Sequence, residues 1–150
     1  MVGIGYDSHR FAPGRKLVLG GVEIEHEQGL DGHSDADVLT HAVIDAILGA
    51  AGGGDIGTLF PPEDEQWRDA DSIDLLRTAV GTIGGAIVNV DATVICEQPR
   101  LGPYKGEMER VLGEATSARV SVKATTNEGM GWIGRGEGIA CIAVATVQSQ

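Results

Sequence analysis

The segment Ala86-Ile87-Val88-Asn89-Val90-Asp91-Ala92-Thr93-Val94-Ile95-Cys96 decides the fold, because it is long, apolar and rich in β-branched residues, as buried strands are. A loop follows it, and apolar residues at helical spacing then predict a helix over about 104–115. Val120-Ser121-Val122-Lys123-Ala124 alternates as a second strand should. A strand, a helix and a strand in succession form a crossover, so we expect the two strands to be parallel, with a right-handed connection.

The sequence on either side of this crossover predicts the other elements. Gly20-Gly21 between two short apolar runs is typical of a two-residue hairpin turn. Further strands are expected at 2–6, 17–19, 22–24 and 138–147, and further helices at about 35–50 and 73–83, with a long irregular segment at 52–69. A hairpin combined with a crossover predicts an α+β fold of two layers, in which about three helices pack on one face of a mixed sheet. We expect one domain over residues 1–150.

The composition excludes several classes of partner. A formal net charge of -11 repels polyanions, which argues against nucleic acid or an anionic membrane as the partner. The sequence has no apolar run of the roughly 18 to 20 residues that a membrane span requires. Its two cysteines, Cys96 and Cys141, lie in apolar strand-like runs and are expected to be buried, reduced thiols. These features predict a cytoplasmic protein.

Asp7 and His9 are candidate metal ligands. They are two residues apart at the end of the first predicted strand, and residues two apart in a strand project from the same face. His41 can supply a third ligand. Two histidines and one carboxylate are a common ligand set of catalytic zinc, which keeps its fourth position open, whereas structural zinc sites are closed and rich in cysteine. The residues therefore predict a Zn²⁺ site that carries chemistry.

The helix that carries His41 supports this hypothesis. Ser34 or Asp35 is expected to be the N-cap of the helix. Asp37, His41 and Asp45 are spaced four apart, so all three should lie on one side of it. Carboxylates beside a histidine can orient its second ring nitrogen, as they do around many metal ligands.

Five short motifs occur in the order and spacing of one family. They are Gly5-Tyr6-Asp7-Ser8-His9, His33-Ser34-Asp35-Ala36-Asp37, Gly54-Asp55-Ile56-Gly57, Lys123-Ala124-Thr125-Thr126-Asn127-Glu128 and Gly134-Arg135-Gly136-Glu137-Gly138-Ile139-Ala140. Through them the chain resembles the 2-C-methyl-D-erythritol 2,4-cyclodiphosphate synthases over essentially all 150 residues. The resemblance implies a lyase of the non-mevalonate pathway of isoprenoid biosynthesis. It implies conversion of 4-diphosphocytidyl-2-C-methyl-D-erythritol 2-phosphate into the cyclic diphosphate, with release of CMP.

The resemblance also implies a role for each matching residue. Asp7, His9 and His41 match the zinc ligands, and Glu128 matches the ligand of a second divalent cation, Mg²⁺ or Mn²⁺. His33 matches a diphosphate-contacting residue that stabilises the transition state together with Thr126. The other matching positions are expected to bind substrate: Ser34 the diphosphate; Asp55, Ile56, Gly57, Phe60, Pro61, Pro62, Glu63 and Asp64 the ribose and methylerythritol hydroxyls; Cys96, Glu97, Gln98, Pro99, Arg100, Leu101, Gly102 and Thr125 the cytosine; and Asn127, Trp132 and Arg135 further parts of the site.

Family members are homotrimers with active sites between subunits, so the resemblance implies the same assembly here. The implied reaction is in-line attack of the 2-phosphate on the β-phosphorus, with metal ions offsetting the repulsion between the phosphates. The chain departs from the family pattern at Asn127, Trp132 and Pro62-Glu63. Pro62 lacks a carboxylate and a backbone donor, so the groups that would bind the methylerythritol hydroxyls are the least defined part of the site.

Two other functions are compatible with these residues. A metal-dependent phosphohydrolase would use zinc-bound water as its nucleophile and release free phosphate. A non-catalytic protein could bind an isoprenoid diphosphate in the apolar central channel that family trimers have near the 134–138 segment. The second alternative leaves the three-ligand metal site unexplained.

Overall fold

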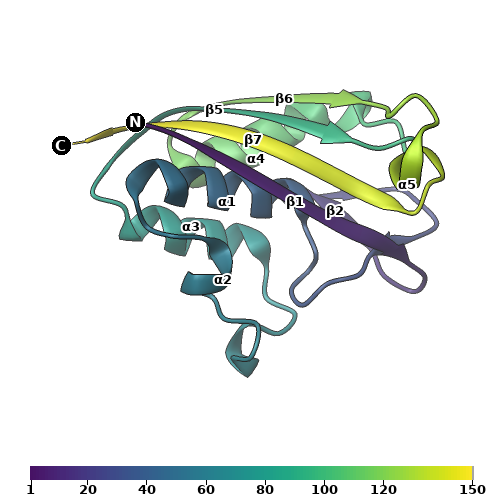
Figure 1. Cartoon of the computed structure of the whole chain (residues 1–150), viewed down its shortest axis with the longest axis horizontal. Helices are drawn as coiled ribbons and strands as arrows, with labels where there is room; N and C mark the ends of the chain where they lie inside the picture. The colour runs from purple at the N-terminus through teal and green to yellow at the C-terminus, as the bar shows by residue number, and fades with distance from the viewer. Residues whose placement is uncertain (150) are drawn as a thin grey trace.

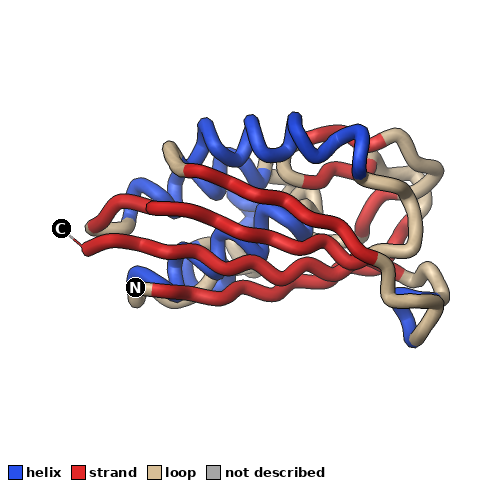
Figure 2. Tube along the Cα trace, turned by 90° about the horizontal axis from the view of Figure 1, so that it is seen from above, coloured by secondary structure: helices blue, strands red, loops and turns tan. Residues whose placement is uncertain are grey.

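The computed structural model describes residues 1–149 as two layers, a twisted five-stranded sheet and a set of helices on one of its faces (Figures 1 and 2). The sheet contains β1 (Val2–Ala12), β4 (Gly29–Leu30), β5 (Gly85–Ile95), β6 (Arg119–Thr125) and β7 (Gly138–Ser149), in the order β4-β1-β7-β5-β6. The helices are α1 (Val38–Ala51), α2 (Ile56–Leu59), α3 (Ser72–Thr82), α4 (Lys105–Thr116) and α5 (Gly131–Gly134), with single 3-10 turns η1 (Glu65–Trp67) and η2 (Gly102–Tyr104).

The predicted parallel pairing across the crossover is confirmed, and with it the mixed sheet. β5 and β6 pair in parallel, in a register that places Val90 beside Val120, and α4 lies between them in the sequence. The other strand pairs of the sheet are antiparallel, including β1 with β7 and β5 with β7. The first and last strands of the chain are therefore neighbours near the middle of the sheet.

The predicted hairpin forms, but it stands apart from the main sheet. β2 (Leu17–Leu19) and β3 (Val22–Ile24) make a separate two-stranded sheet. Gly20 and Gly21 join them with φ angles of 59° and 72° in the left-handed region, which a type I′ turn requires at both central positions. Asp37 accepts hydrogen bonds from both glycine N–H groups at 2.8 Å, so the turn is fixed to the start of α1.

Two predicted boundaries are corrected. β1 continues past Tyr6 to Ala12, so Asp7 and His9 lie inside the strand. The N-cap of α1 is Asp37, and the prediction of Ser34 or Asp35 was wrong. Ala36 has a φ of 56°, and this left-handed conformation interrupts any helix that begins earlier. The segment at 52–69 is also less irregular than expected, because it contains α2 and η1.

Glycine lets α1 approach β1 at backbone distance. A Cβ atom placed on Gly5 would lie 1.9 Å from the carbonyl oxygen of Ala42, and one on Gly3 would lie 2.0 Å from that of Ala46. No side chain fits at these distances, so only glycine permits the contact. The contact holds the first turns of α1 directly over the strand that carries Asp7 and His9.

The face of the sheet away from the helices is apolar and exposed. Ile4 is 71% exposed and Tyr6 57% exposed. The register pairs them with Val144 and Ile142 of β7, which are also exposed. Both cysteines are buried and unpaired, as predicted. Among residues 1–149, no helix has the length and apolar character needed to cross a bilayer.

Candidate metal centre and substrate pocket

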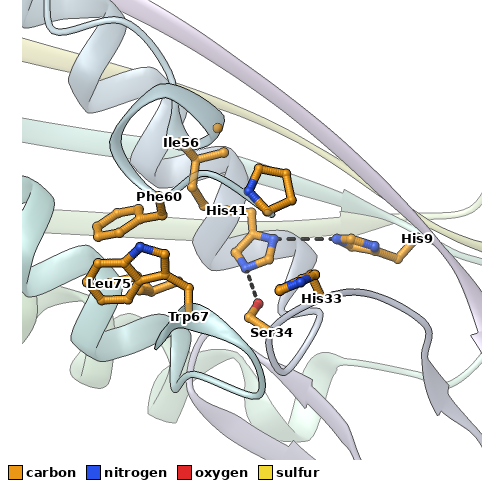
Figure 3. A pocket seen from close by; sticks show the side chains of 10 residues that line it. His9, His33, Ser34, His41, Ile56, Phe60, Trp67 and Leu75 are labelled. Atoms are coloured by element: carbon orange, nitrogen blue, oxygen red, sulfur yellow. Dashed lines mark hydrogen bonds between the residues drawn. The ribbon is translucent and has the colours of Figure 1, made fainter. Parts of the chain in front are cut away.

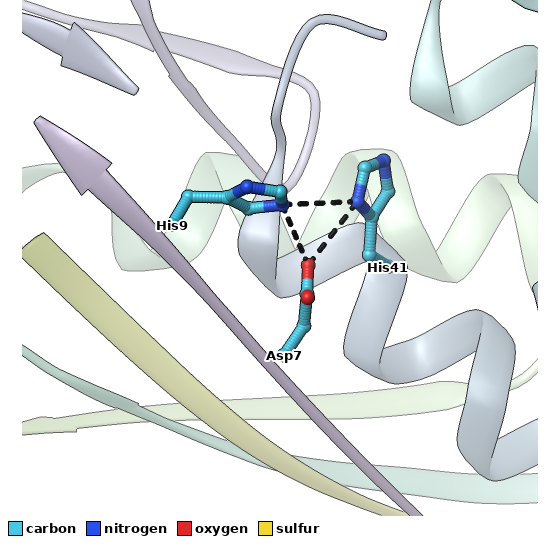
Figure 4. Close-up of side chains that lie close together, drawn as sticks. All are labelled: Asp7, His9 and His41. Atoms are coloured by element: carbon cyan, nitrogen blue, oxygen red, sulfur yellow. Dashed lines mark hydrogen bonds and ion pairs between the residues drawn. The ribbon is translucent and has the colours of Figure 1, made fainter. Parts of the chain in front are cut away.

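The three predicted metal ligands converge between β1 and α1. Alternation along β1 points Asp7 and His9 toward the helical layer, where His41 meets them from the first turn of α1 (Figure 4). Asp7 Oδ2 lies 2.8 Å from Nε2 of His9 and 3.2 Å from Nδ1 of His41. The two ring nitrogens are 3.4 Å apart. The structure thus brings together two nitrogens and one carboxylate oxygen as a group that can bind a metal ion.

The spacing of these atoms fits a tetrahedral ion. Metal–ligand distances of about 2.0–2.1 Å at the tetrahedral angle place neighbouring ligand atoms about 3.3–3.4 Å apart. Two of the three separations are within about 0.2 Å of this range, and the third is shorter. Two imidazoles and a carboxylate suit zinc well. Three protein ligands leave a fourth position for another molecule.

The electrostatics of the group are those of a tight ion pair. Burial raises the pKa of Asp7, but hydrogen bonds from His41 and His9 outweigh it and lower this pKa to about 2. Burial lowers the pKa of His41, and the neighbouring Asp7 carboxylate more than reverses the effect, so this pKa is raised above its ordinary value. Asp7 is therefore ionised throughout the neutral range, as a metal ligand must be.

The groups around the second nitrogen of His41 differ from the prediction. Nε2 contacts the hydroxyl oxygen of Ser72 at 2.8 Å and that of Ser34 at 3.0 Å. Asp37 and Asp45, which were expected to orient this ring, make hydrogen bonds elsewhere. Asp37 caps α1 and binds the hairpin turn, and Asp45 accepts a hydrogen bond from the N–H of Ile56. Ser72 has no sequence signal for this role, because it lies 31 residues from His41.

A cavity opens beside the metal ligands. Its polar side is formed by the histidines and Ser34, and its apolar side by Phe60, Trp67 and Leu75 (Figure 3). Phe60 and Trp67 pack edge to face, with ring centroids 4.9 Å apart. Trp67 and Leu75 were not predicted, although Trp67 lies in the long segment that was predicted to be irregular at 52–69. The predicted residues that line this cavity are His9, His33, Ser34, His41, Ile56, Gly57, Phe60 and Pro62.

Four predicted residues of the same segment do not line the cavity: Asp55, Pro61, Glu63 and Asp64. Asp55 and Asp64 each cap a short helix. The Asp55 carboxylate caps α2 by accepting from the N–H of Thr58 at 2.7 Å. Asp64 caps η1 by accepting from the N–H of Gln66.

The residues predicted to bind cytosine gather at a second cavity, at the carboxyl ends of β5 and β6. It is lined by Cys96, Glu97, Pro99, Arg100, Leu101, Ala124, Thr125 and Thr126. The parallel pairing of the two strands explains this, because it places the segments after each strand at the same edge. Burial raises the pKa of the Cys96 thiol to about 11, so this thiol stays neutral. Of the other two predicted residues, Gln98 lines a separate hollow with Arg135, and Gly102 begins η2.

The loop after β6 carries Thr126, Asn127 and Glu128. One oxygen of Glu97 accepts hydrogen bonds from the N–H groups of Asn127 and Gly129, at 3.0 and 3.1 Å. Glu128 is exposed, has a φ of 54°, and does not belong to the Asp7, His9 and His41 group. Trp132 lines a further hollow, together with His9 and Glu137. Within one chain, the predicted site residues are therefore spread over several hollows.

The mixed sheet, its single helical layer and the three converging ligands define an α+β protein with a candidate divalent-metal site. The family model of the YgbB family matches residues 1–148, and the chain belongs to that family.

Relatives agree with this assignment over almost the full chain. The chain is 56% identical over 153 aligned positions to the 2-C-methyl-D-erythritol 2,4-cyclodiphosphate synthase of Symbiobacterium thermophilum, covering 98% of each chain. It is similar to the bifunctional IspDF structure of Campylobacter jejuni, with a TM-score of 0.94 and 41% identity, covering 99% of this chain and 42% of that one. It is also similar to a 2C-methyl-D-erythritol-2,4-cyclodiphosphate synthase structure in its CDP-bound form, with a TM-score of 0.88, 33% identity, and coverage of 99% and 100%.

Proposed function

We propose that this chain converts 4-diphosphocytidyl-2-C-methyl-D-erythritol 2-phosphate into 2-C-methyl-D-erythritol 2,4-cyclodiphosphate and CMP, in isoprenoid biosynthesis. The observation that carries the proposal is the convergence of Asp7, His9 and His41 beside a cavity, in a chain whose relatives are named as synthases of this product. A similar structure in a CDP-bound form supports a cytidine nucleotide as part of the substrate.

Asp7, His9 and His41 would hold Zn²⁺, whose ligand preferences they fit. When bound, the ion would act as a Lewis acid that reduces the charge of a substrate phosphate. His33 and Ser34 line the adjacent cavity and would donate hydrogen bonds to the diphosphate. The apolar wall of Ile56, Phe60 and Trp67 would exclude water from the reacting phosphates and contact the methylerythritol carbons.

The Cys96–Gly102 loop and Thr125 would bind the cytosine at the second cavity. Thr126 lies at this cavity and would stabilise the transition state together with His33. The exposed Glu128 carboxylate would hold a second cation, Mg²⁺ or Mn²⁺. No side chain needs to act as a nucleophile, because the 2-phosphate attacks the β-phosphorus and CMP leaves. Rigid placement of both phosphates can account for several kcal/mol of the barrier.

A homotrimer would complete the site. The apolar sheet face that includes Ile4, Tyr6, Ile142 and Val144 is exposed in one chain, and a contiguous apolar face of this kind is typical of an interface. Assembly through this apolar face would bring the hollows of one chain next to the hollows of a neighbouring chain. The one domain, 1–150, would then be the repeating unit. We also propose a cytoplasmic location, which the two buried free thiols support.

Phosphorus NMR of the protein incubated with the diphosphocytidyl substrate, Zn²⁺ and Mg²⁺ tests the reaction. We expect a cyclic diphosphate and an equal amount of CMP. Free phosphate without the cyclic product would identify a phosphohydrolase. Substrate that stays unchanged while still binding would identify a non-catalytic binding protein.

The metal centre is tested by His41→Ala. This change removes one of three ligands, so we expect zinc binding and turnover to be lost together. His26→Ala is the matched control, because His26 packs against Phe11 outside the ligand group and should leave the zinc content unchanged. Normal turnover of a metal-depleted His41→Ala protein contradicts the proposal.

A further inference from the structure

Ser72 is a fully buried hydroxyl residue at the first position of α3. Its hydroxyl donates a short hydrogen bond to Oδ1 of Asp35, and its backbone N–H donates to Oδ2 of the same carboxylate at 3.0 Å. A carboxylate can only accept. The direction of the first bond is therefore fixed, and the single proton of the Ser72 hydroxyl is committed to Asp35.

Because the Ser72 hydroxyl donates its proton to Asp35, it can act only as a hydrogen-bond acceptor toward His41. The Ser72 oxygen lies 2.8 Å from Nε2 of His41, and with its proton directed at Asp35 it can present only a lone pair there. Nε2 must then be the nitrogen that carries hydrogen. Nδ1 is the nitrogen that faces Asp7 and His9 (Figure 4), and its lone pair is the one required to bind a metal ion.

Other groups do not duplicate this arrangement. Asp37 and Asp45 are bonded to backbone N–H groups elsewhere. Ser34 contacts the same Nε2 at 3.0 Å, but among the bonds of the described residues its hydroxyl has no carboxylate acceptor to fix its direction. Ser34 also lines the cavity, where its proton remains available to a ligand. At Nε2 of the His41 ring, the Asp35 carboxylate acting through Ser72 is the only chain of bonds with a fixed direction within residues 1–149.

We propose that Asp35 and Ser72 are positioning residues of the metal centre, which fix the orientation of the His41 ring and keep the Nδ1 lone pair directed at the metal. The proposal deepens the proposed function and rests on zinc binding by Asp7, His9 and His41. It also makes the first turn of α3 part of the metal site, although no residue of α3 belongs to the group of metal ligands.

The test measures Zn²⁺ affinity by competition with a chromophoric chelator, without substrate. Partners of ligating histidines typically contribute 10- to 100-fold in metal affinity, so Ser72→Ala should weaken zinc binding by about 10-fold or more. Asp35→Asn should weaken it as well, because an amide no longer forces the direction of the Ser72 hydroxyl. Thr116→Val is the control for loss of a buried hydroxyl in another helix. Asp71→Asn is the control for a carboxylate next to Ser72, since Asn also serves as an N-cap.

A second measurement reports on the bond itself. In zinc-loaded protein with ¹⁵N-labelled histidine, the Nε2-bound proton of His41 should exchange slowly in the wild type and faster in Ser72→Ala. A purely structural role of Ser72 would lower the unfolding temperature of the metal-free protein and leave zinc affinity unchanged. If folded Ser72→Ala and Asp35→Asn proteins bind zinc with wild-type affinity, the proposed positioning role is wrong, but the metal centre itself is not contradicted. Failure of the wild type to bind zinc would instead reject the metal centre, and this proposal with it.

Discussion

Glu97 accepts a hydrogen bond from the backbone N–H of Asn127 at 3.0 Å, across the gap between two loops that follow neighbouring parallel strands. The same carboxylate oxygen binds the N–H of Gly129. Glu97 lies in the loop proposed to bind the nucleobase, here called the nucleobase loop, and Asn127 lies between Thr126 and Glu128. The nucleobase loop is thus joined directly to the loop that carries the residues proposed to act on the phosphates.

Glu97→Ala should loosen this connection. Two N–H groups would lose their acceptor, so we expect faster amide hydrogen exchange at Asn127 and Gly129. Turnover should fall by roughly 10- to 100-fold, because misplacement of a catalytic loop is costly. Glu97→Gln keeps an acceptor oxygen, so its turnover and its amide exchange rates should lie between those of the wild type and of Glu97→Ala. Glu114→Ala, an exposed carboxylate of α4, is the control. Unchanged exchange at Asn127 and Gly129 contradicts the assigned role.

Gly5→Ala should strongly destabilise the protein. The added carbon would lie 1.9 Å from the carbonyl oxygen of Ala42, so α1 would have to move away from β1. We expect a loss of about 3 kcal/mol or more in the free energy of unfolding, together with weaker zinc binding, because His41 moves with α1. Denaturant unfolding and chelator competition measure the two effects.

Gly49→Ala is the matched control for that prediction. Gly49 is exposed on the same helix, and its nearest contact to an added Cβ is an ordinary 3.9 Å. Replacing a helical glycine by alanine stabilises by about 0.5–1 kcal/mol. If Gly5→Ala were as stable as Gly49→Ala, the close approach of α1 and β1 would be wrong.

Only part of the fold and of the metal site could be predicted from the sequence. Strand alternation in Gly5-Tyr6-Asp7-Ser8-His9 was enough to place Asp7 and His9 on one face, and helical spacing identified the helix of His41. The parallel pairing was equally predictable, because a strand, a helix and a strand in succession form the crossover that parallel neighbours need. Local periodicity does not report which face of α1 meets β1, and this depends on backbone contact at Gly3 and Gly5.

The residues around His41 were predicted wrongly for a related reason. Spacing on α1 favoured Asp37 and Asp45, but a side chain binds whichever backbone groups the tertiary structure brings to it. The hairpin turn brings two N–H groups to Asp37, and the start of α2 brings one to Asp45. Ser72 comes from a helix whose placement only the packed structure defines. The substrate contacts and the trimer stay predictions.

Asp45→Asn tests the effect of pH on stability. Burial raises the pKa of Asp45 above its ordinary 3.8, although a hydrogen bond from the N–H of Ile56 opposes this. Because the pKa of the folded state lies above that of the unfolded state, the stabilising contribution of Asp45 is complete below the unfolded pKa. It is lost as the pH rises through the folded pKa.

Asparagine does not titrate, and its amide oxygen can still accept from Ile56. The free energy of unfolding of Asp45→Asn relative to the wild type should therefore increase from about pH 4 to about pH 7. Urea denaturation at several pH values measures this difference. A constant difference over the range would show that Asp45 titrates alike in both states.

Ile4→Glu should disrupt the proposed trimer. Ile4 is 71% exposed in one chain, so a charge there costs little in the monomer, but three such charges would be buried together in an assembly through this face. We expect the wild type to sediment as a trimer, and the variant as a folded monomer with little activity. Thr78→Glu, on the exposed side of α3, should remain a trimer. If Ile4→Glu sediments as a trimer, the subunit interface does not include the sheet face that contains Ile4.

The pairing of β1 with β7 imposes an order on biosynthesis. The strand that carries Asp7 and His9 is made first, yet its neighbour toward the centre of the sheet comprises residues 138–149. On the ribosome, β1 has only the two-residue strand β4 as a sheet partner until β7 has emerged. The strand that carries two of the metal ligands therefore gains its central sheet neighbour only after all the helices described here have been made.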